Sequence, residues 1–242
     1  MSDTSLKNQQ VVVIGGTSGI GREVAKEAAQ RGATVTVIGR SAKADDNLRG
    51  VVAITAITAI AADVTDNAAL NQAFAAIGRI DHLVLTAGAR VGSPKLTDLK
   101  RDELELAFNV KLFGSLFAIQ AALPYLTPKA SVTLTSGLLS RKFGPGGLLK
   151  STLNAAVEAT AKTLAKELAP RRVNVVSPGV IDTELWGEAG AESRVAAMAR
   201  IGQGLPVGRV GTPQDVAQAY LLAMENGFVS GAVFDIEGGG LL

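Results

Sequence analysis

The stretch VVVIGGTSGIG, residues 11–21, joins a run of apolar β-formers directly to a cluster of glycines. The β-branched run over residues 11–14 does not alternate with polar residues, which predicts a parallel strand buried on both faces. The glycines allow a tight turn, a close approach of backbone to a ligand and a helix packed near the sheet. That helix, expected over residues 22–31, would point its N-terminal amides and positive dipole end at a pyrophosphate. The stretch therefore predicts a dinucleotide site, and the alternative is an ordinary glycine-rich turn.

The composition sets the class of protein. With 242 residues, 47% hydrophobic and 19% charged, the chain suits one α/β domain over residues 1–242. A net charge of +2 without a run of basic residues argues against nucleic acid. No cysteine and a single histidine exclude disulfides and thiolate or histidine-rich metal sites. The start MSDTSLKNQQ lacks a signal-peptide core, and the longest apolar stretch, 51–62, is too short and threonine-broken to span a bilayer. We expect a cytoplasmic protein that binds a small molecule, with no nucleic-acid, membrane or metal partner.

Strand and helix patterns alternate along the whole chain. After the opening unit, strands are expected at 34–38, within 57–62, and at 82–86, 131–136, 172–176 and 233–236. Helices are expected at 67–77, 102 to about 126, 149–168, 192–201 and 213–225. The order predicts an α/β fold of the Rossmann type, a doubly wound seven-stranded parallel sheet with helices on both faces. The repetitive AITAITAI leaves the register of the third strand open. Segment 184–202 follows a strand end and is expected to form a substrate lid.

The end of the second strand bears on cofactor choice. It continues into Gly39, Arg40 and Ser41. In dinucleotide folds an acidic residue about 20 positions after the glycine loop holds the ribose 2′-hydroxyl, whereas arginine there accommodates a 2′-phosphate. Because residues 39–41 hold no carboxylate, we predict NADP(H), with Arg40 and Ser41 on its phosphate. The alternative is a solvated arginine at a strand end.

Two further strand ends are expected at the same edge, since ligands of open α/β sheets lie off the carboxyl ends. Asp63 and Val64 are predicted to meet the adenine, although Asp63 could instead cap the helix beginning near Asn67. The small residues Ala87 and Gly88 would let the cofactor approach closely. His82 lies at the opposite end of its strand, so we do not expect a catalytic role for it.

Together these segments resemble the short-chain dehydrogenase/reductase family over nearly the full length of the chain. Its TGxxxGxG loop is matched from Gly15 with Ile14 in place of threonine, NAG by residues 86–88, and further motifs by residues 109–110, 135–136, VNVVSPG at 173–179, Thr183 and 209–213. The resemblance implies a cofactor across the strand ends, and commonly a homodimer or homotetramer. The implied cofactor contacts are Gly15, Thr17, Ser18, Gly19, Ile20 and Gly21 in the loop, with Pro178, Gly179, Ile181 and Thr183 around the nicotinamide.

The catalytic residues are where this chain departs from the family. Members usually place a tyrosine acid four residues ahead of a lysine, with a serine and an asparagine in support. The resemblance implies Ser136 and Asn109 for the last two. Where the family has YxxSKAAVEA the chain has KSTLNAAVEA, which puts Lys150 at the tyrosine position and Asn154 at the lysine position. The two tyrosines, Tyr125 and Tyr220, are expected to be packing residues in helices.

The substitution leaves the chemistry open. Hydride transfer to a carbonyl builds an alkoxide that needs a proton, and Lys150 could supply it if desolvation or the nicotinamide charge lowered its pKa from about 10.4. Otherwise Lys150 is a solvated lysine at a helix start. We therefore predict an NADP(H)-dependent oxidoreductase acting on a small carbonyl or an activated C=C bond. The alternative is an NADP(H)-binding protein with little or no turnover, acting as a redox sensor or a partner subunit.

Overall fold

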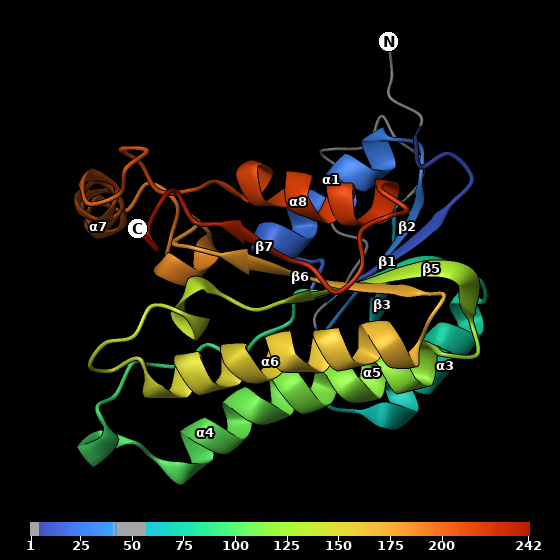
Figure 1. The fold of residues 1–242 in the computed structure, drawn as a ribbon, viewed down its shortest axis with the longest axis horizontal. Coiled ribbons are helices and arrows are strands. Elements are labelled where there is room, and N and C mark those ends of the chain that lie inside the picture. The colour runs from blue at the N-terminus through green and yellow to red at the C-terminus, as the bar shows by residue number, and fades with distance from the viewer. Residues whose placement is uncertain (1–4, 41, 43–56) are drawn as a thin grey trace.

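Seven parallel strands form one sheet in the order β3-β2-β1-β4-β5-β6-β7 (Figure 1). The computed structural model describes residues 5–40, 42 and 57–242. The strands are β1 Gln10–Ile14, β2 Thr34–Gly39, β3 Ile57–Ala61, β4 Ile80–Leu85, β5 Leu126–Thr135, β6 Arg172–Pro178 and β7 Val233–Ile236. The order reverses between β1 and β4, as in a doubly wound fold. The predicted architecture is therefore confirmed.

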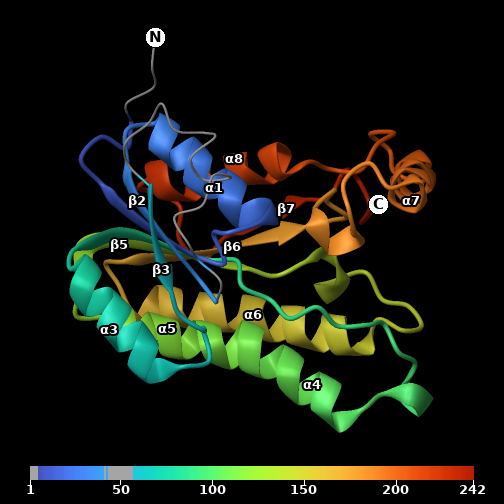
Figure 2. The ribbon, with the colours of Figure 1, turned by 180° about the vertical axis from the view of Figure 1, so that it is seen from behind.

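Helices cover both faces of the sheet (Figures 1 and 2). They are α1 Gly19–Gln30, α3 Asn67–Ile77, α4 Arg101–Phe108, α5 Gly114–Ala122, α6 Leu148–Glu167, α7 Glu192–Gln203 and α8 Pro213–Glu225. Short turns are η1 Leu96–Asp98, η3 Leu138–Ser140 and η4 Glu184–Trp186, and a π-helical turn η2 spans Asn109–Phe113. Helices α1 and α8 lie on one face, and α3, α5 and α6 on the other. Helix α7 lies apart, near the end of β7.

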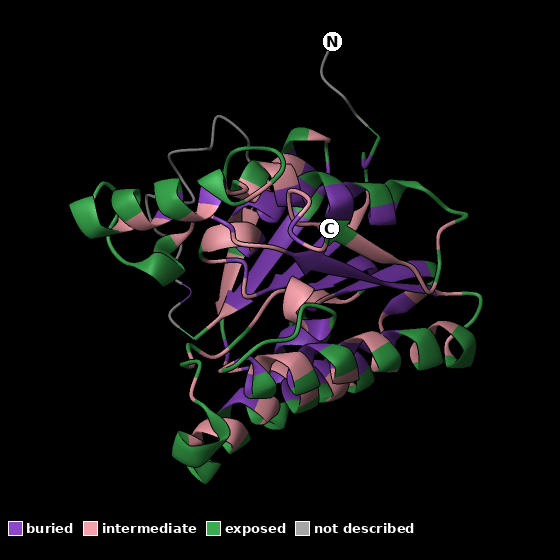
Figure 3. Ribbon diagram, turned by 60° about the vertical axis from the view of Figure 1, so that its left-hand side comes forward, coloured by how far each residue is buried: buried purple, intermediate pink, exposed green. Residues whose placement is uncertain are grey.

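The central strand β1 is buried on both faces, as its unbroken apolar run predicts. Val12 and Ile14 join the cluster that includes Phe74 of α3, whereas Val11 and Val13 join the cluster that includes Tyr220 of α8. Successive side chains of a strand point to opposite faces, so a strand between two helical layers must be apolar at every position. Figure 3 shows the consequence: the sheet is buried and the outer helix faces are exposed.

The helix predicted over 102–126 is continuous as predicted, but it ends earlier. The π-helical turn Asn109–Phe113 joins α4 to α5 in one helix over Arg101–Ala122. Pro124 explains the end, because proline has no backbone N–H to continue the helical hydrogen bonds. Strand β5 then begins at Leu126, five residues before the predicted start at 131. Helical periodicity alone does not reveal where apolar residues pass from helix to strand.

By length and composition the helical stretch Arg101–Ala122 would suffice to cross a membrane. In the structure this stretch belongs to the layer over the sheet. Ala118, Ile119 and Ala122 of α5 are buried in the same core cluster as β4 and β5. Some of the apolar residues of this stretch thus pack against the sheet.

Candidate cofactor and active site

The glycine loop between β1 and α1 brings bare backbone to the carboxyl edge of the sheet. Gly15 has φ of 84°, and a Cβ there would lie 2.7 Å from the backbone nitrogen of Ala87. A Cβ on Gly21 would collide with the carbonyl oxygen of Gly15. Ser18 precedes α1 without a side-chain hydrogen bond to it, so Ser18 leaves the first amides of the helix to other acceptors, such as an anion. The loop has the form that a pyrophosphate site requires.

A cleft of about 800 Å³ opens at this edge. Its volume lies in the range of small-molecule sites, which is about 300–1,000 Å³. It begins at the point where the strand order reverses between β1 and β4, the usual ligand position in doubly wound sheets. Among the residues predicted from sequence, those that line it are Gly15, Thr17, Ser18, Gly19, Ile20, Gly21, Arg40, Asp63, Val64, Ala87, Gly88, Lys150, Asn154 and Thr183.

Other predicted residues lie elsewhere. Ser41 falls outside the described residues. Pro178 and Gly179 stand at the carboxyl end of β6, but neither they nor Ile181 line the cleft. Ile181 packs into the core on the α1 and α8 side. Of the four residues predicted around the nicotinamide, Thr183 lines the cleft, whereas Pro178, Gly179 and Ile181 do not.

Arg40 and Asp63 follow neighbouring strands and both face the cleft. Arg40 is exposed at the end of β2. The Asp63 carboxylate accepts hydrogen bonds from the Thr65 backbone nitrogen at 2.9 Å and from Thr65 Oγ1 at 2.8 Å. These bonds, with a contribution from the charge of Arg40, hold the pKa of Asp63 below its ordinary value. Arg40 is thus an exposed cation beside the ribose end expected for the cofactor.

The cap of α3 is Asp66 and not Asp63. Asp66 accepts hydrogen bonds from the backbone nitrogens of Ala68 and Ala69, each at 3.0 Å. The alternative in which Asp63 caps this helix is therefore wrong. An aspartate three residues nearer to the helix fits the N-cap geometry, because its side chain reaches the free amides of the first turn.

The asparagine implied by the resemblance is not at the cleft, and a lysine is. Asn109 is exposed and does not line the cleft, whereas Lys111 does. Residues two apart on a helix do not share a face, so the two side chains diverge. Lys111 Nζ donates to Asn154 Oδ1 at 2.6 Å and to the carbonyl oxygen of Ser136 at 2.9 Å. Burial lowers the pKa of Lys111 to about 8, partly opposed by the charge of Glu158.

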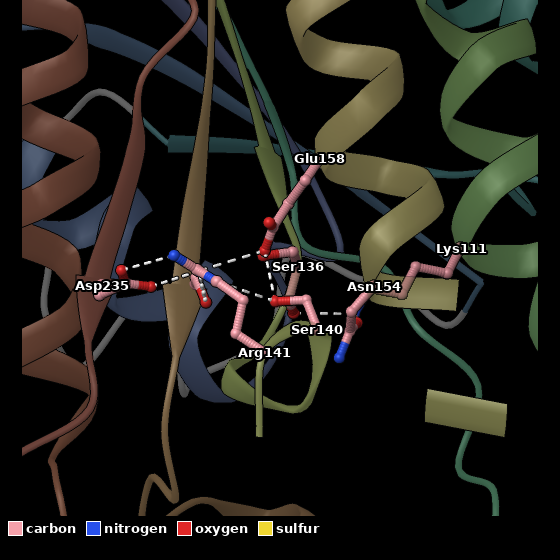
Figure 4. A network of polar contacts seen from close by, with 8 residues as sticks. Lys111, Ser136, Ser140, Arg141, Asn154, Glu158 and Asp235 are labelled. Carbon is pink, nitrogen blue, oxygen red and sulfur yellow. Dashed lines mark hydrogen bonds and ion pairs between the residues drawn. The ribbon is translucent and has the colours of Figure 1, made fainter. Parts of the chain in front are cut away.

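Ser136 is buried, and its hydroxyl is turned to a different network, seen in Figure 4. Its Oγ donates to Glu158 Oε1 at 2.9 Å, as does Ser140 Oγ at 2.7 Å. Arg141 joins Glu158 to Asp235. Ser136 is not among the residues that line the cleft, and the role of its hydroxyl beside a substrate stays a prediction. The next residue, Gly137, faces Asn154: a Cβ there would lie 2.9 Å from Asn154 Nδ2.

Lys150 and Asn154 stand one turn apart on α6 and both line the cleft. Lys150 Nζ donates to Ser93 Oγ at 2.9 Å, at an exposed position. Asn154 is buried and its amide oxygen is held by Lys111. Two ammonium groups thus enter one cleft, one near its surface and one inside.

Neither tyrosine nor the histidine reaches the cleft. Tyr220 is buried and its hydroxyl bonds Thr135 Oγ1 at 2.6 Å, while Tyr125 packs against the core cluster on the α3 side. His82 is buried, with Nδ1 2.7 Å from Ser131 Oγ. The packing role predicted for the two tyrosines is in keeping with their contacts, although Tyr125 follows α5 instead of lying in a helix.

The segment predicted as a lid contacts the glycine loop. Glu184 of η4 accepts a hydrogen bond from the Gly19 backbone nitrogen at 3.1 Å and pairs with Arg22 of α1. Arg90 donates to the carbonyl oxygens of Glu184 and Leu185. A carboxylate of this segment therefore lies at the N-terminus of α1, where an anion is favoured.

Comparisons with known proteins agree with this geometry. A family model described as enoyl-(acyl carrier protein) reductase matches residues 15–240. The short-chain dehydrogenase/reductase ucsE of Acremonium sp is 32% identical over 255 residues, which cover 98% of this chain and 97% of that protein. The chain belongs to the short-chain dehydrogenase/reductase family. It is accordingly an oxidoreductase of this type.

Solved structures of short-chain dehydrogenases share the fold closely. A small-chain dehydrogenase in complex with NADPH is 38% identical with a TM-score of 0.83, over 96% of this chain and 98% of that one. The MalC reductase/Diels-Alderase from Malbranchea aurantiaca is 28% identical with a TM-score of 0.89, over 99% of this chain and 98% of that one. The match spans the whole sheet and both helical layers, so the cleft lies on a scaffold shared with these oxidoreductases.

Proposed function

We propose that this short-chain dehydrogenase/reductase is NADP(H)-dependent and transfers hydride between NADPH and a small carbonyl or an activated C=C substrate. The observation that carries the proposal is the cleft of about 800 Å³, which gathers the glycine loop, Arg40 and Asn154 at one edge of the sheet. A relative 38% identical to this chain was solved in complex with NADPH. NADPH, when bound, supplies the hydride.

The residues present fit this cofactor. Gly15 and Gly21 have no room for a Cβ, so backbone lies where the pyrophosphate needs it, while nothing lies within 4 Å of a Cβ built on Gly88. The amides at the start of α1 would hold the pyrophosphate, and Arg40, with Ser41, the 2′-phosphate. Asp63 and Val64 would meet the adenine, and Ala87 and Gly88 the adjoining ribose region. Pro178, Gly179, Ile181 and Thr183 would surround the nicotinamide.

The proposed catalytic set differs from that of the family. Lys150 and Asn154 occupy the tyrosine and lysine positions, and no tyrosine lines the cleft, both tyrosines of the chain being accounted for. Ser136 and Asn109 stay in the proposed set as supporting residues, although neither is among the residues that line the cleft. Lys150 is retained, as an oxyanion partner or as the acid, and a comparison with Lys111 decides between these two roles. An activated C=C bond would relax the need for an acid, since the proton can pass from solvent to carbon.

A panel assay tests the proposal. We expect purified protein to bind NADPH with higher affinity than NADH and to oxidise it in the presence of at least one ketone, aldehyde, quinone or enone. Binding is followed by the fluorescence of the reduced nicotinamide and turnover by its absorbance. Heat-denatured protein gives the background. Tight binding with no turnover over the whole panel would contradict the proposed enzyme activity. It would instead favour the second function, an NADP(H)-binding protein with little or no turnover.

The second function is an NADP(H)-binding protein with little or no turnover, serving as a redox sensor or partner subunit. The observation that favours it is the amide of Asn154, which replaces a charged lysine and is already engaged by Lys111. Cofactor binding rests mainly on backbone and Arg40 and would survive this change. General acid catalysis, worth about 10² to 10⁴ in rate, is what would be lost.

We also propose that the protein is cytoplasmic and forms a homodimer or homotetramer, with segment 184–202 as the substrate lid. Leu106, Phe113 and Phe117 are 45–50% exposed along α4, η2 and α5, which supports a covered apolar face. Light scattering on the purified chain measures the oligomeric state. A monomer at micromolar concentration would contradict the assembly.

A further inference from the structure

Lys111 is a half-buried cation that lines the cleft and has no ion pair among the described residues. Its ammonium can donate three hydrogen bonds. Two are accounted for, by Asn154 Oδ1 at 2.6 Å and the Ser136 carbonyl oxygen at 2.9 Å. Both acceptors are neutral. Removing a cation from water without a counterion is unfavourable, so packing alone does not explain a lysine at this position.

The nearest negative charge is committed elsewhere. Glu158 of α6 acts on Lys111 through its field, yet its carboxylate receives Ser136 Oγ, Ser140 Oγ and Arg141 (Figure 4). The other charged groups on neighbouring elements or in the cleft are Lys150, Lys162, Lys166 and Glu167 on α6, Arg101, Asp102, Glu103 and Glu105 on α4, and Arg40, Asp63, Arg90 and Glu184 around the cleft. Helix α5 carries none. On α4, Glu103 holds the Gly92 backbone nitrogen and Arg101 pairs with Glu105.

We propose that Lys111 is the catalytic residue that delivers the proton to the substrate oxygen, and that Asn154 positions its ammonium through their hydrogen bond. The inference rests on the proposed function and names the acid of that site. The turn η2 thereby supplies, from the opposite helix, the positive charge that Asn154 lacks. The hydrogen bond therefore joins Asn154 to a lysine at residue 111, and not to the lysine at residue 150 that the sequence pointed to.

The step balances in atoms and charge. The carbonyl carbon receives the hydride supplied by NADPH, and the C=O π pair moves onto the oxygen. A new O–H bond forms as one N–H bond of the Lys111 ammonium breaks, leaving the neutral amine. Water returns the proton to the amine. The products are the alcohol and NADP⁺.

Lys111 suits the role of the acid better than Lys150, which leaves Lys150 as the oxyanion partner of the proposed set. The Lys150 ammonium bonds an exposed serine, Ser93, near the surface of the cleft. Lys111 lies inside, and a pKa near 8 lets it lose and regain a proton near neutral pH, as an efficient general acid requires. The two lysines therefore make a matched pair of variants in one cleft.

The first experiment compares Lys111→Met with Lys150→Met in the oxidation of NADPH by the best substrate of the panel. We expect kcat to fall roughly 100-fold or more for Lys111→Met and less than about tenfold for Lys150→Met. Wild-type kcat should decline above pH of about 8, and the decline should persist in Lys150→Met. The reverse order of losses would overturn the inference while leaving the proposed function standing.

The second experiment needs no turnover. The positive oxidised nicotinamide disfavours a nearby ammonium, so NADP⁺ binding at pH 8 should release up to about half a proton per site, because half of such groups are then protonated. Calorimetry in two buffers of different ionisation enthalpy measures this release. We expect it in wild type and Lys150→Met and not in Lys111→Met. If Lys111→Met released as many protons as wild type, the released proton would come from another group.

A charge relocation guards against misfolding of Lys111→Met. Lys111→Asn combined with Asn154→Lys moves the ammonium to the other side of the same hydrogen bond. The kcat of this double variant should be at least about tenfold higher than that of Lys111→Asn alone. Asn154→Lys alone sets two ammonium groups side by side and should be impaired. A relocated pair no better than Lys111→Asn, with wild-type affinity for NADPH, would count against the inference. Failure of wild type to bind NADPH would remove both proposals together.

Discussion

Arg40 is the residue on which the choice of cofactor depends, because it is an exposed cation that ends β2 at the cleft. Hydrogen bonds to charged groups contribute about 1.5–3 kcal/mol. Arg40→Ala should therefore raise the Kd for NADPH by roughly 10- to 100-fold and change that for NADH by less than about twofold. Titration of the fluorescence of both reduced cofactors checks this. Arg101→Ala, an exposed arginine on α4, is the control, and equal losses for both cofactors would remove Arg40 from the phosphate site.

Single residues also show how far the sequence reaches. Lys150 and Asn154 could be placed at the cleft from sequence because a local motif fixes their spacing on one helix. Lys111 could not, because residue type pointed to Asn109 two positions earlier, and the turn η2 decides which of the two faces the cleft. A visible signal was present: in FNVKLFG, one lysine interrupts an apolar helical run. Such a lysine is either at the surface or in a site.

Among the elements, the segment after β6 places a carboxylate at the N-terminus of helix α1, where the cofactor would also bind. The Glu184 carboxylate occupies the N-terminus of α1 through the Gly19 amide, where the pyrophosphate would bind. An anion at a helix N-terminus is stabilised by about 0.3–1 kcal/mol. Glu184→Gln should therefore tighten NADPH binding by about two- to fivefold, measured by calorimetry at low salt. Glu188→Gln makes the same charge change at an exposed position of the same segment and should leave the affinity unchanged. Weaker binding by Glu184→Gln would show that Glu184 supports the cofactor.

Elements differ in how well their ends can be predicted. Helix α8 runs over Pro213–Glu225 as predicted, since proline and the capping pair of Thr212 and Asp215 mark its start locally. Strand β5 gave no such mark, and its first five residues carry Pro128 and Lys129, which do not fit a strand pattern. Leu126 joins the sheet by pairing with Ile80 of β4, and the register then shifts before Ser131 pairs with His82. That pairing is a tertiary contact without a local sequence signal.

At the scale of the whole molecule, the sheet order explains why short motifs far apart in sequence form one site. The loops after β1 and β4 meet because these strands are neighbours on either side of the reversal in strand order. Each motif alone is weak, but all seven strands are parallel, so their carboxyl ends lie at one edge of the sheet. The fold was therefore predictable from the alternation of elements. The inward direction of each side chain at that edge depended on turns such as η2.

The stability of the molecule should depend on pH through its single histidine. Burial lowers the pKa of His82 from 6.5 to about 4. Below pH 6.5 the unfolded chain protonates this ring while the folded protein keeps it neutral, so stability falls as pH falls towards 4. The free energy of unfolding should drop by about 2 kcal/mol between pH 7 and 5, above the range in which most carboxylates titrate. Urea unfolding at several pH values measures it. His82→Gln should flatten the slope in this range whatever its own stability, and an unchanged slope would assign the dependence to other groups.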